Sequence, residues 1–128
     1  MAISDLNHFT VLTDDVPGTV RFYAELVGLV EGPRPAFDFP GAWLYAGSRA
    51  VLHVVGGRPR ELLRPGVIDH VAFSATGLGD TLARLEAHGI DAICRRLPGD
   101  GDWQVFFSDP NGARVELDFP AGEAGPAQ

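Results

Sequence analysis

One order of predicted elements, a strand, a helix and three strands, occurs twice along this chain. In the first half, an apolar run at 6–11 predicts a strand. Apolar residues then recur at helical spacing from Val16 to Val27, and Gly28 stands where a helix would end. Asp14 and Asp15 are candidates to cap that helix. Three short apolar or alternating runs follow as predicted strands: 30–39, 42–46 and 50–55.

The second half begins after a segment at 56–66 that is rich in Arg, Pro and Gly and that we interpret as a linker. A strand at 68–73 and a helix from Leu78 to about Gly89 follow it. The remaining predicted strands are 92–97, 103–107 and 113–119. We therefore predict a single domain over 1–128, with modules at about 5–56 and 67–120, a linker at 57–66 and a frayed tail at 121–128.

Both halves place a histidine and a second polar side chain at matching positions. His8 stands in Leu-Asn-His-Phe, and His70 stands in Ile-Asp-His-Val. His8 and His53 are 45 residues apart, and His70 and Glu116 are 46 residues apart. The repeated spacing, together with the repeated element order, predicts that these pairs occupy equivalent places in the two modules.

This pattern has two interpretations. A single histidine in a strand is usually structural, and a single strand glutamate usually faces solvent. In the last predicted strand, alternation puts Glu116 on the face opposite Val115 and Leu117, so it points into a cavity or into solvent. Taken together, His8, His70 and Glu116 are the ligand set of a facial triad for Fe(II) or a similar divalent ion. The joint pattern favours this metal site.

The residue composition excludes several kinds of catalytic site and binding partner. All ten basic residues are Arg, which excludes a Schiff-base lysine and a phosphate-loop lysine. The net charge of −7 argues against nucleic acid as a partner. The one cysteine, Cys94, excludes an internal disulfide and a cysteine-based zinc site, and we expect it to be a small buried hydrophobe. With neither a secretory signal nor an apolar run of about 20 residues, a cytoplasmic protein without membrane contact is expected.

Over about residues 5–120 the chain resembles the vicinal oxygen chelate superfamily, which includes glyoxalase I, extradiol dioxygenases, fosfomycin-resistance enzymes and bleomycin resistance proteins. Four segments carry the resemblance: Leu6-Asn7-His8, Arg21-Phe22-Tyr23 with Leu26-Val27-Gly28-Leu29, Ile68-Asp69-His70-Val71-Ala72-Phe73, and Asp109-Pro110-Asn111-Gly112 leading into Val115-Glu116-Leu117. The resemblance implies an α+β fold of two tandem βαβββ modules that form a cupped mixed sheet around a metal site. It also implies a homodimer.

What the resemblance implies for the site is a divalent metal ion on His8, His70 and Glu116, with Fe(II) or Mn(II) favoured over Zn(II) or Ni(II). Glyoxalase I-like members carry a carboxylate where this chain has His53, whereas extradiol dioxygenase-like members often have an acid–base histidine nearby. His53 is therefore the expected catalytic residue. The tyrosine usual in dioxygenases about ten residues before the last ligand is missing, and Tyr45 is a candidate substitute.

The function expected first is a small dioxygenase-like oxidoreductase that chelates its substrate through adjacent oxygens. The alternatives are a glyoxalase I-like isomerase or lyase and a non-catalytic protein for drug binding or resistance. The substrate is expected to be aromatic or of the enediol type. Six residues are candidates to line its pocket, with core packing equally open for the aromatic ones: Phe37, Trp43, Tyr45, Trp103, Phe106 and Arg114.

Two further expectations concern charged neighbours of the predicted ligands. Arg114 shares a face with Glu116, where it holds a substrate anion or, the version favoured, an ion pair with Asp118. Asn7 and Asp69 alternate away from the adjoining histidines and are not expected to be ligands.

Overall fold

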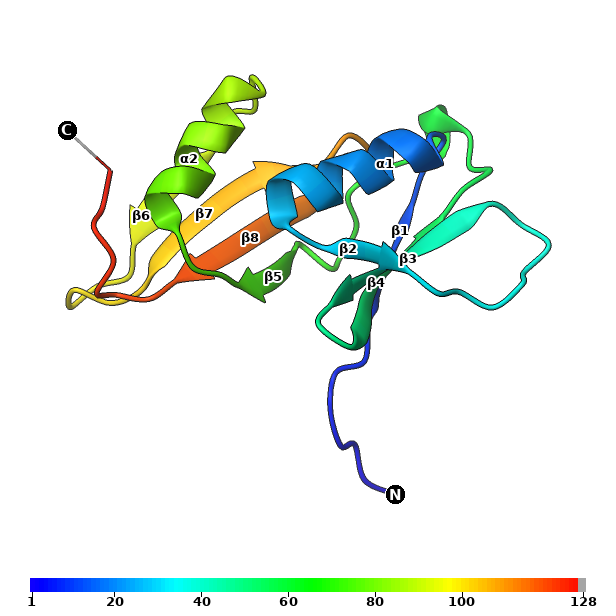
Figure 1. Cartoon of the computed structure of the whole chain (residues 1–128), viewed down its shortest axis with the longest axis horizontal. Helices are drawn as coiled ribbons and strands as arrows, with labels where there is room; N and C mark the ends of the chain where they lie inside the picture. The colour runs from blue at the N-terminus through cyan, green and yellow to red at the C-terminus, as the bar shows by residue number, and fades with distance from the viewer. Residues whose placement is uncertain (127–128) are drawn as a thin grey trace. The chain divides into compact units, whose positions relative to one another are not determined.

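The structure is a computed structural model that describes residues 1–126, and its chain divides into two compact units (Figure 1). Unit 1 is Met1–Arg64 and unit 2 is Pro65–Gln128, so the boundary falls inside the predicted linker. A short 3-10 helix, η2, at Arg60–Leu62 lies in that linker. Each unit is described by itself below.

Unit 1 holds a mixed four-stranded sheet in the order β1 (Phe9–Leu12), β4 (Arg49–Val55), β3 (Gly41–Ala46) and β2 (Val30–Gly32). β1 pairs with β4 in parallel, and the other pairs are antiparallel. The helix α1 (Val16–Phe22) continues as a π-helical turn, η1 (Tyr23–Val27), and lies against β3 and β4 (Figure 1). This helix side of the sheet is the core of unit 1, where Leu44 and Leu52 are fully buried.

The ends of α1 follow from local sequence. Asp15 is the N-cap, and its carboxylate accepts a hydrogen bond from the Gly18 amide at 3.1 Å. Gly28 ends η1 with a φ of +85°, a left-handed conformation that costs glycine little. The predicted cap and stop are therefore confirmed.

Unit 2 repeats this plan with strand order β5 (Val71–Ser74), β8 (Arg114–Phe119), β7 (Trp103–Ser108) and β6 (Ile93–Arg96). β5 and β8 are parallel, and the other pairs are antiparallel. The helix α2 (Leu78–Ala87) buries Leu78 and Leu85 completely. The sequence prediction of an α+β fold with two βαβββ modules, each with a mixed sheet, is confirmed.

Three element boundaries differ from the sequence prediction by three residues or more. β1 and β5 begin at Phe9 and Val71, because their pairing with the parallel neighbour starts there. The predicted strand at 30–39 stops at Gly32, since Pro33 and Pro35 follow and have no amide hydrogen for a ladder. The two histidines therefore lie immediately before their strands rather than inside them.

The segment after Phe119, predicted to fray, makes defined contacts. The Glu123 carboxylate accepts hydrogen bonds from the Gly77 amide at 3.0 Å and from the Leu78 amide at 2.7 Å, at the start of α2. The indole of Trp103 donates to the Glu123 carbonyl at 3.1 Å. Residues 127 and 128 of the predicted tail lie outside the described part of the chain.

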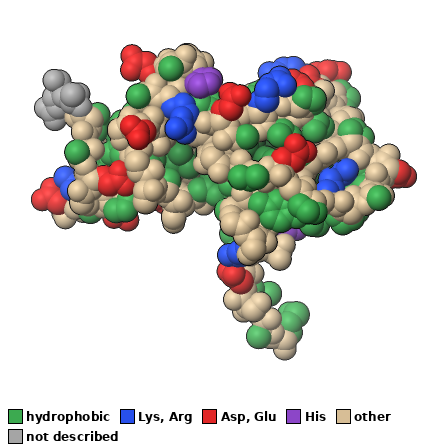
Figure 2. All heavy atoms as spheres, in the orientation of Figure 1, with side chains coloured by type: hydrophobic (Ala, Val, Ile, Leu, Met, Phe, Trp, Pro, Cys, Tyr) green, Lys and Arg blue, Asp and Glu red, His purple; other side chains and the backbone are tan. Residues whose placement is uncertain are grey.

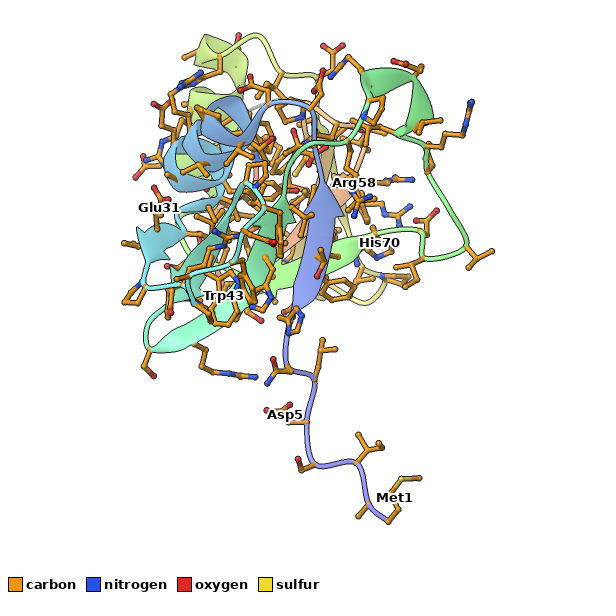
Figure 3. All side chains as sticks on the ribbon, turned by 90° about the vertical axis from the view of Figure 1, so that its right-hand side faces the viewer. Met1, Asp5, Glu31, Trp43, Arg58 and His70 are labelled. Carbon is orange, nitrogen blue, oxygen red and sulfur yellow. The ribbon has the colours of Figure 1, made fainter. Side chains whose placement is uncertain are left out.

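The chain before β1 is an extended segment, on which Met1 and Asp5 are labelled in Figure 3. Its apolar side chains Met1, Ile3 and Leu6 are exposed, and Figure 2 shows the segment standing away from the rest of unit 1. Arg49 holds its inner end by donating to the Leu6 carbonyl at 2.8 Å. His8 is thus placed where the tethered segment enters the sheet. Within residues 1–126, no helix is both long enough and apolar enough to span a membrane.

Candidate metal centre and substrate face

The two sheets place His53 and Glu116 at the same register relative to their histidines. Thr10, two residues after His8, lies opposite His53 in the β1–β4 ladder. Ala72, two residues after His70, lies opposite Glu116 in the β5–β8 ladder. In each unit the histidine and its partner lie on the sheet face away from the helix. Side chains alternate along a strand, and the residues on either side of His53 and Glu116 are buried in the core of their unit: Leu52, Val54, Val115 and Leu117. We call this the open face of each sheet.

In unit 2, the open face brings His70 and Glu116 into contact. The His70 Nε2 atom lies 2.9 Å from Glu116 Oε1. Glu116 is buried, with 5% of its surface exposed, and its Oε2 accepts a hydrogen bond from the Gln104 amide at 3.2 Å. The Phe106 ring stands edge-on to His70 with a centroid distance of 5.9 Å. Two of the three predicted ligands therefore converge within this unit.

Each predicted histidine ligand also contacts the residue immediately before it. Asp69 Oδ2 lies 2.7 Å from His70 Nδ1, and Asn7 Oδ1 lies 2.7 Å from His8 Nδ1. The hydrogen bond with His70 is the main cause that lowers the pKa of Asp69. Neither contact was predicted, because alternation along a strand does not apply to residues that precede it. The available signal was the Asn or Asp directly before both histidines.

In unit 1, the open face carries a stack of three rings. His8 lies on His53 with a centroid distance of 3.7 Å, and His53 lies on Trp43 at 4.0 Å, nearly parallel in both cases. Burial lowers the pKa of His53, the nearby charge of His8 lowers it further, and a hydrogen bond with the Ala50 backbone opposes the shift. This lowering of the pKa favours the neutral form of His53, and the two stacking contacts cover both faces of its ring.

The predicted pocket residues of unit 1 extend this stack in part. Phe37 stacks on Phe39 at 4.9 Å and lies 6.5 Å from Trp43, so it continues the aromatic row. The Tyr45 hydroxyl donates a hydrogen bond to the Pro33 carbonyl at 2.6 Å. Tyr45 is thus engaged with backbone and is poorly placed to act as a substitute acid.

In unit 2, the predicted pocket residues divide between the two faces. Phe106 is on the open face, with the guanidinium groups of Arg95 and Arg114 at 4.7 and 4.8 Å from its ring centre. Trp103 shares the helix-covered face with Val105, so the structure does not bring it together with Glu116. The ion pair of Arg114 is with Asp69, at 4.0 Å, rather than with Asp118 as expected.

Carboxylates accumulate beside the predicted ligand Glu116. Burial raises the pKa of Asp118 to about 6, and a hydrogen bond with Glu116 together with the charges of Glu116 and Asp102 adds to the shift. Gln104 acts against it through a hydrogen bond. Within residues 1–126, no three His, Cys, Asp or Glu side chains form a ready metal-binding group. His8 belongs to unit 1, and His70 and Glu116 belong to unit 2.

Comparison with known proteins defines the class. Residues 5–117 match the Glyoxalase/Bleomycin resistance protein/Dioxygenase superfamily, and the chain belongs to this family. It is 31% identical over 123 residues to Glyoxylase I 4 of Arabidopsis thaliana, a match that covers 90% of this chain and 70% of that protein.

Two solved structures share the fold. A glyoxalase family protein from Bacillus anthracis has a TM-score of 0.76 at 23% identity, over 94% of this chain and 98% of that one. A mutant of the fosfomycin resistance protein FosX from Listeria monocytogenes has a TM-score of 0.76 at 17% identity, over 93% and 94%. That FosX structure contains Mn(II) and dihydroxypropylphosphonic acid. A protein of the same fold as this chain therefore binds a divalent metal ion.

Proposed function

We propose that this protein is a divalent-metal-dependent enzyme that chelates its substrate through two adjacent oxygens. The observation that carries the proposal is the contact of His70 with Glu116 at 2.9 Å, at the register that His8 and His53 occupy in unit 1. His8, His70 and Glu116 are the proposed ligands, and His53 is the proposed catalytic residue.

The residues present suit such an ion. Two imidazole nitrogens and one carboxylate are a usual donor set for Fe(II) or Mn(II), and Zn(II) and Ni(II) also accept it. Glu116 is buried, and no arginine within residues 1–126 pairs with it. A buried carboxylate needs a compensating positive charge, so a cation beside it would lower the cost of burial.

The chain's own residues supply proton transfer and orientation. A bound divalent ion would act as a Lewis acid toward the chelating oxygens. Burial and the nearby charge of His8 lower the pKa of His53, which favours the neutral imidazole that can accept a proton. Its stacked position between His8 and Trp43 leaves only the ring edge available, which fixes the direction of transfer.

Among reactions of this kind, we propose first an isomerase or lyase that forms an enediol, as in glyoxalase I. The supporting observation is the identity of 31% with Glyoxylase I 4 over 90% of this chain. In such a reaction His53 takes a proton from the carbon next to a carbonyl and returns it to the neighbouring atom.

An extradiol dioxygenase-like reaction is the second candidate. The aromatic row of His53, Trp43 and Phe37 favours it, because a flat catechol ring would stack beside these side chains. The Tyr45 hydroxyl donates a hydrogen bond to the Pro33 carbonyl, so His53 would be the acid–base residue in this reaction too.

Metal binding tests the proposal first. Calorimetry with Mn(II), Fe(II), Zn(II) and Ni(II) should find one site per chain, and His70→Ala should weaken it about 100-fold. His88→Gln is the matched control, because His88 lies at the end of α2 and bonds the Arg84 carbonyl. A parent protein that binds none of the four metals would contradict the proposal.

Two assays then separate the reactions. Loss of the hemithioacetal of methylglyoxal and glutathione reports the glyoxalase-type reaction, and oxygen uptake with catechols reports the dioxygenase. His53→Gln should lower kcat in the active assay about 100-fold while metal affinity changes less than about threefold. Ligand binding without turnover in both assays would instead support the binding-only alternative.

A further inference from the structure

We propose that Asn7, Asp69 and Gln104 are positioning residues, each of which binds one donor atom of a ligand and so turns the other donor atom toward the metal ion. The inference rests on the proposed function, since it concerns the same ligands. Its basis is that every proposed ligand has a polar side chain within hydrogen-bond distance in its own unit: Asn7 at His8, Asp69 at His70 and Gln104 at Glu116.

The two histidines are supported in the same way. In both, an oxygen of the preceding residue lies 2.7 Å from Nδ1. A carboxylate oxygen or an amide oxygen can only accept, so the ring proton must lie on Nδ1. The lone pair is then on Nε2, which in His70 lies 2.9 Å from Glu116 Oε1. Two acceptor atoms at this distance repel each other unless a cation lies beside both, so this tautomer suits a metal ion at that position. Metal-binding histidines in general donate their second ring nitrogen to such an acceptor, which fixes tautomer and orientation.

Glu116 is supported by a short chain of hydrogen bonds. Arg95 Nε donates to Gln104 Oε1 at 3.2 Å, which fixes the amide with its nitrogen toward Glu116. That nitrogen donates to Glu116 Oε2 at 3.2 Å. Gln104 thus binds Oε2, whereas Oε1 faces His70 Nε2 and is the oxygen that a metal ion beside His70 would bind.

The use of Asn at one histidine and Asp at the other provides an internal control. If an amide oxygen suffices for His8, then Asp69→Asn should preserve the orientation of His70, whereas Asp69→Ala should lose it. A purely structural role of Asp69 through its ion pair with Arg114, at 4.0 Å, predicts another result. In that case Arg114→Gln would act like Asp69→Ala.

The first test reads the tautomers in the metal-free protein by long-range nitrogen–proton NMR of the imidazoles at a pH of about 8.5, where histidine is usually neutral. The parent should show Nδ1–H on His8 and His70. Asn7→Ala should move only His8 to Nε2–H, and Asp69→Ala should move only His70. Asp69→Asn and Arg114→Gln should leave both rings as in the parent.

The second test measures affinity for Zn(II) and Mn(II) by competition calorimetry. Asn7→Ala and Asp69→Ala should weaken binding by roughly 10- to 100-fold, and Gln104→Met by about 10-fold. Asp69→Asn should stay within about threefold of the parent. Circular dichroism confirms that each variant is folded.

The inference is overturned if both rings keep their protonated nitrogens unchanged in Asn7→Ala and Asp69→Ala, or if Nδ1 of the parent's His8 or His70 carries no proton. It is also overturned if metal affinity is unchanged in these two variants. A parent that binds no metal contradicts the proposed function instead, and the tautomers alone then decide whether Asn7 and Asp69 orient the rings.

Discussion

The two units have the same strand order and the same ladder register, yet they place different chemistry at one equivalent position. In unit 1 that position is His53, stacked between His8 and Trp43. In unit 2 it is Glu116, which is buried, accepts a hydrogen bond from Gln104 and lies 2.9 Å from His70 Nε2. The backbone thus supplies two similar positions, and the side chain with its neighbours decides whether each suits a proton carrier or a metal ligand.

Exchanging these side chains should give the largest effect. Glu116→His replaces a charged oxygen donor with a neutral nitrogen, so affinity for Mn(II), which prefers oxygen ligands, should fall about 100-fold. His53→Glu adds a carboxylate at the equivalent place, so Mn(II) affinity should be kept within about tenfold or rise. Competition calorimetry on the two variants measures both changes. Equal losses in the two would contradict the division of roles between His53 and Glu116.

Core truncation should affect both units alike. Leu52 in β4 and Leu117 in β8 are 0% and 3% exposed on the helix side of their sheets. Changing either to Ala should lower the free energy of unfolding by about 2–5 kcal/mol, because the removed atoms leave a cavity. Urea denaturation gives these values, with Ile93→Ala, at an exposed position, as the control expected within about 0.5 kcal/mol. A cost below about 1 kcal/mol for one of the two would mean that the two cores are not equivalent.

The fold could be predicted from the sequence because it depends on local periodicity that occurs twice. Alternation in 113–119 correctly separates Glu116 from Val115 and Leu117, and glycine at position 28 correctly ends a helix. The predicted pairs of polar residues could be placed at matching registers for the same reason.

The contacts that hold Glu116 and the start of α2 in place could not be predicted from local periodicity. Gln104 reaches Glu116 across two strands, and sequence spacing alone does not fix which side chains meet there. Alternation within 103–107 does put Trp103 and Phe106 on opposite faces, which argues against both lining one pocket. Glu123 contacts Gly77, 46 residues away, and no local pattern indicates such a contact.

The N-terminal caps of α1 and α2 allow a local contact to be compared with a distant one. Asp15 caps α1 from the adjacent residue, whereas Glu123 binds the first amides of α2 from beyond the last strand. Asp15→Ala and Glu123→Ala should each lower the free energy of unfolding by about 1 kcal/mol. Urea denaturation measures both values. Glu123→Ala should also speed hydrogen exchange at Leu78, and unchanged exchange there would contradict the capping role of Glu123.

The smallest expected effect is on the reaction rate of a cysteine thiol, which only unit 2 contains. Cys94 lies in the edge strand β6, whereas the corresponding edge strand of unit 1, β2, has no cysteine. Burial raises the pKa of the Cys94 thiol, because a thiolate is poorly solvated there. Only the thiolate reacts readily, so alkylation by iodoacetamide at pH 8 should be several-fold slower than for a free cysteine.

The rate of Cys94 alkylation should keep rising above the pH at which a free cysteine levels off, since a higher pKa moves the titration upward. Urea should restore the ordinary rate by exposing the thiol, and Cys94→Ser provides the unlabelled control in mass spectrometry. A folded protein that reacts at the free-cysteine rate would show that β6 opens readily. In that case the edge of the unit 2 sheet, next to the strand that carries Gln104, would be less rigid than the support of Glu116 requires.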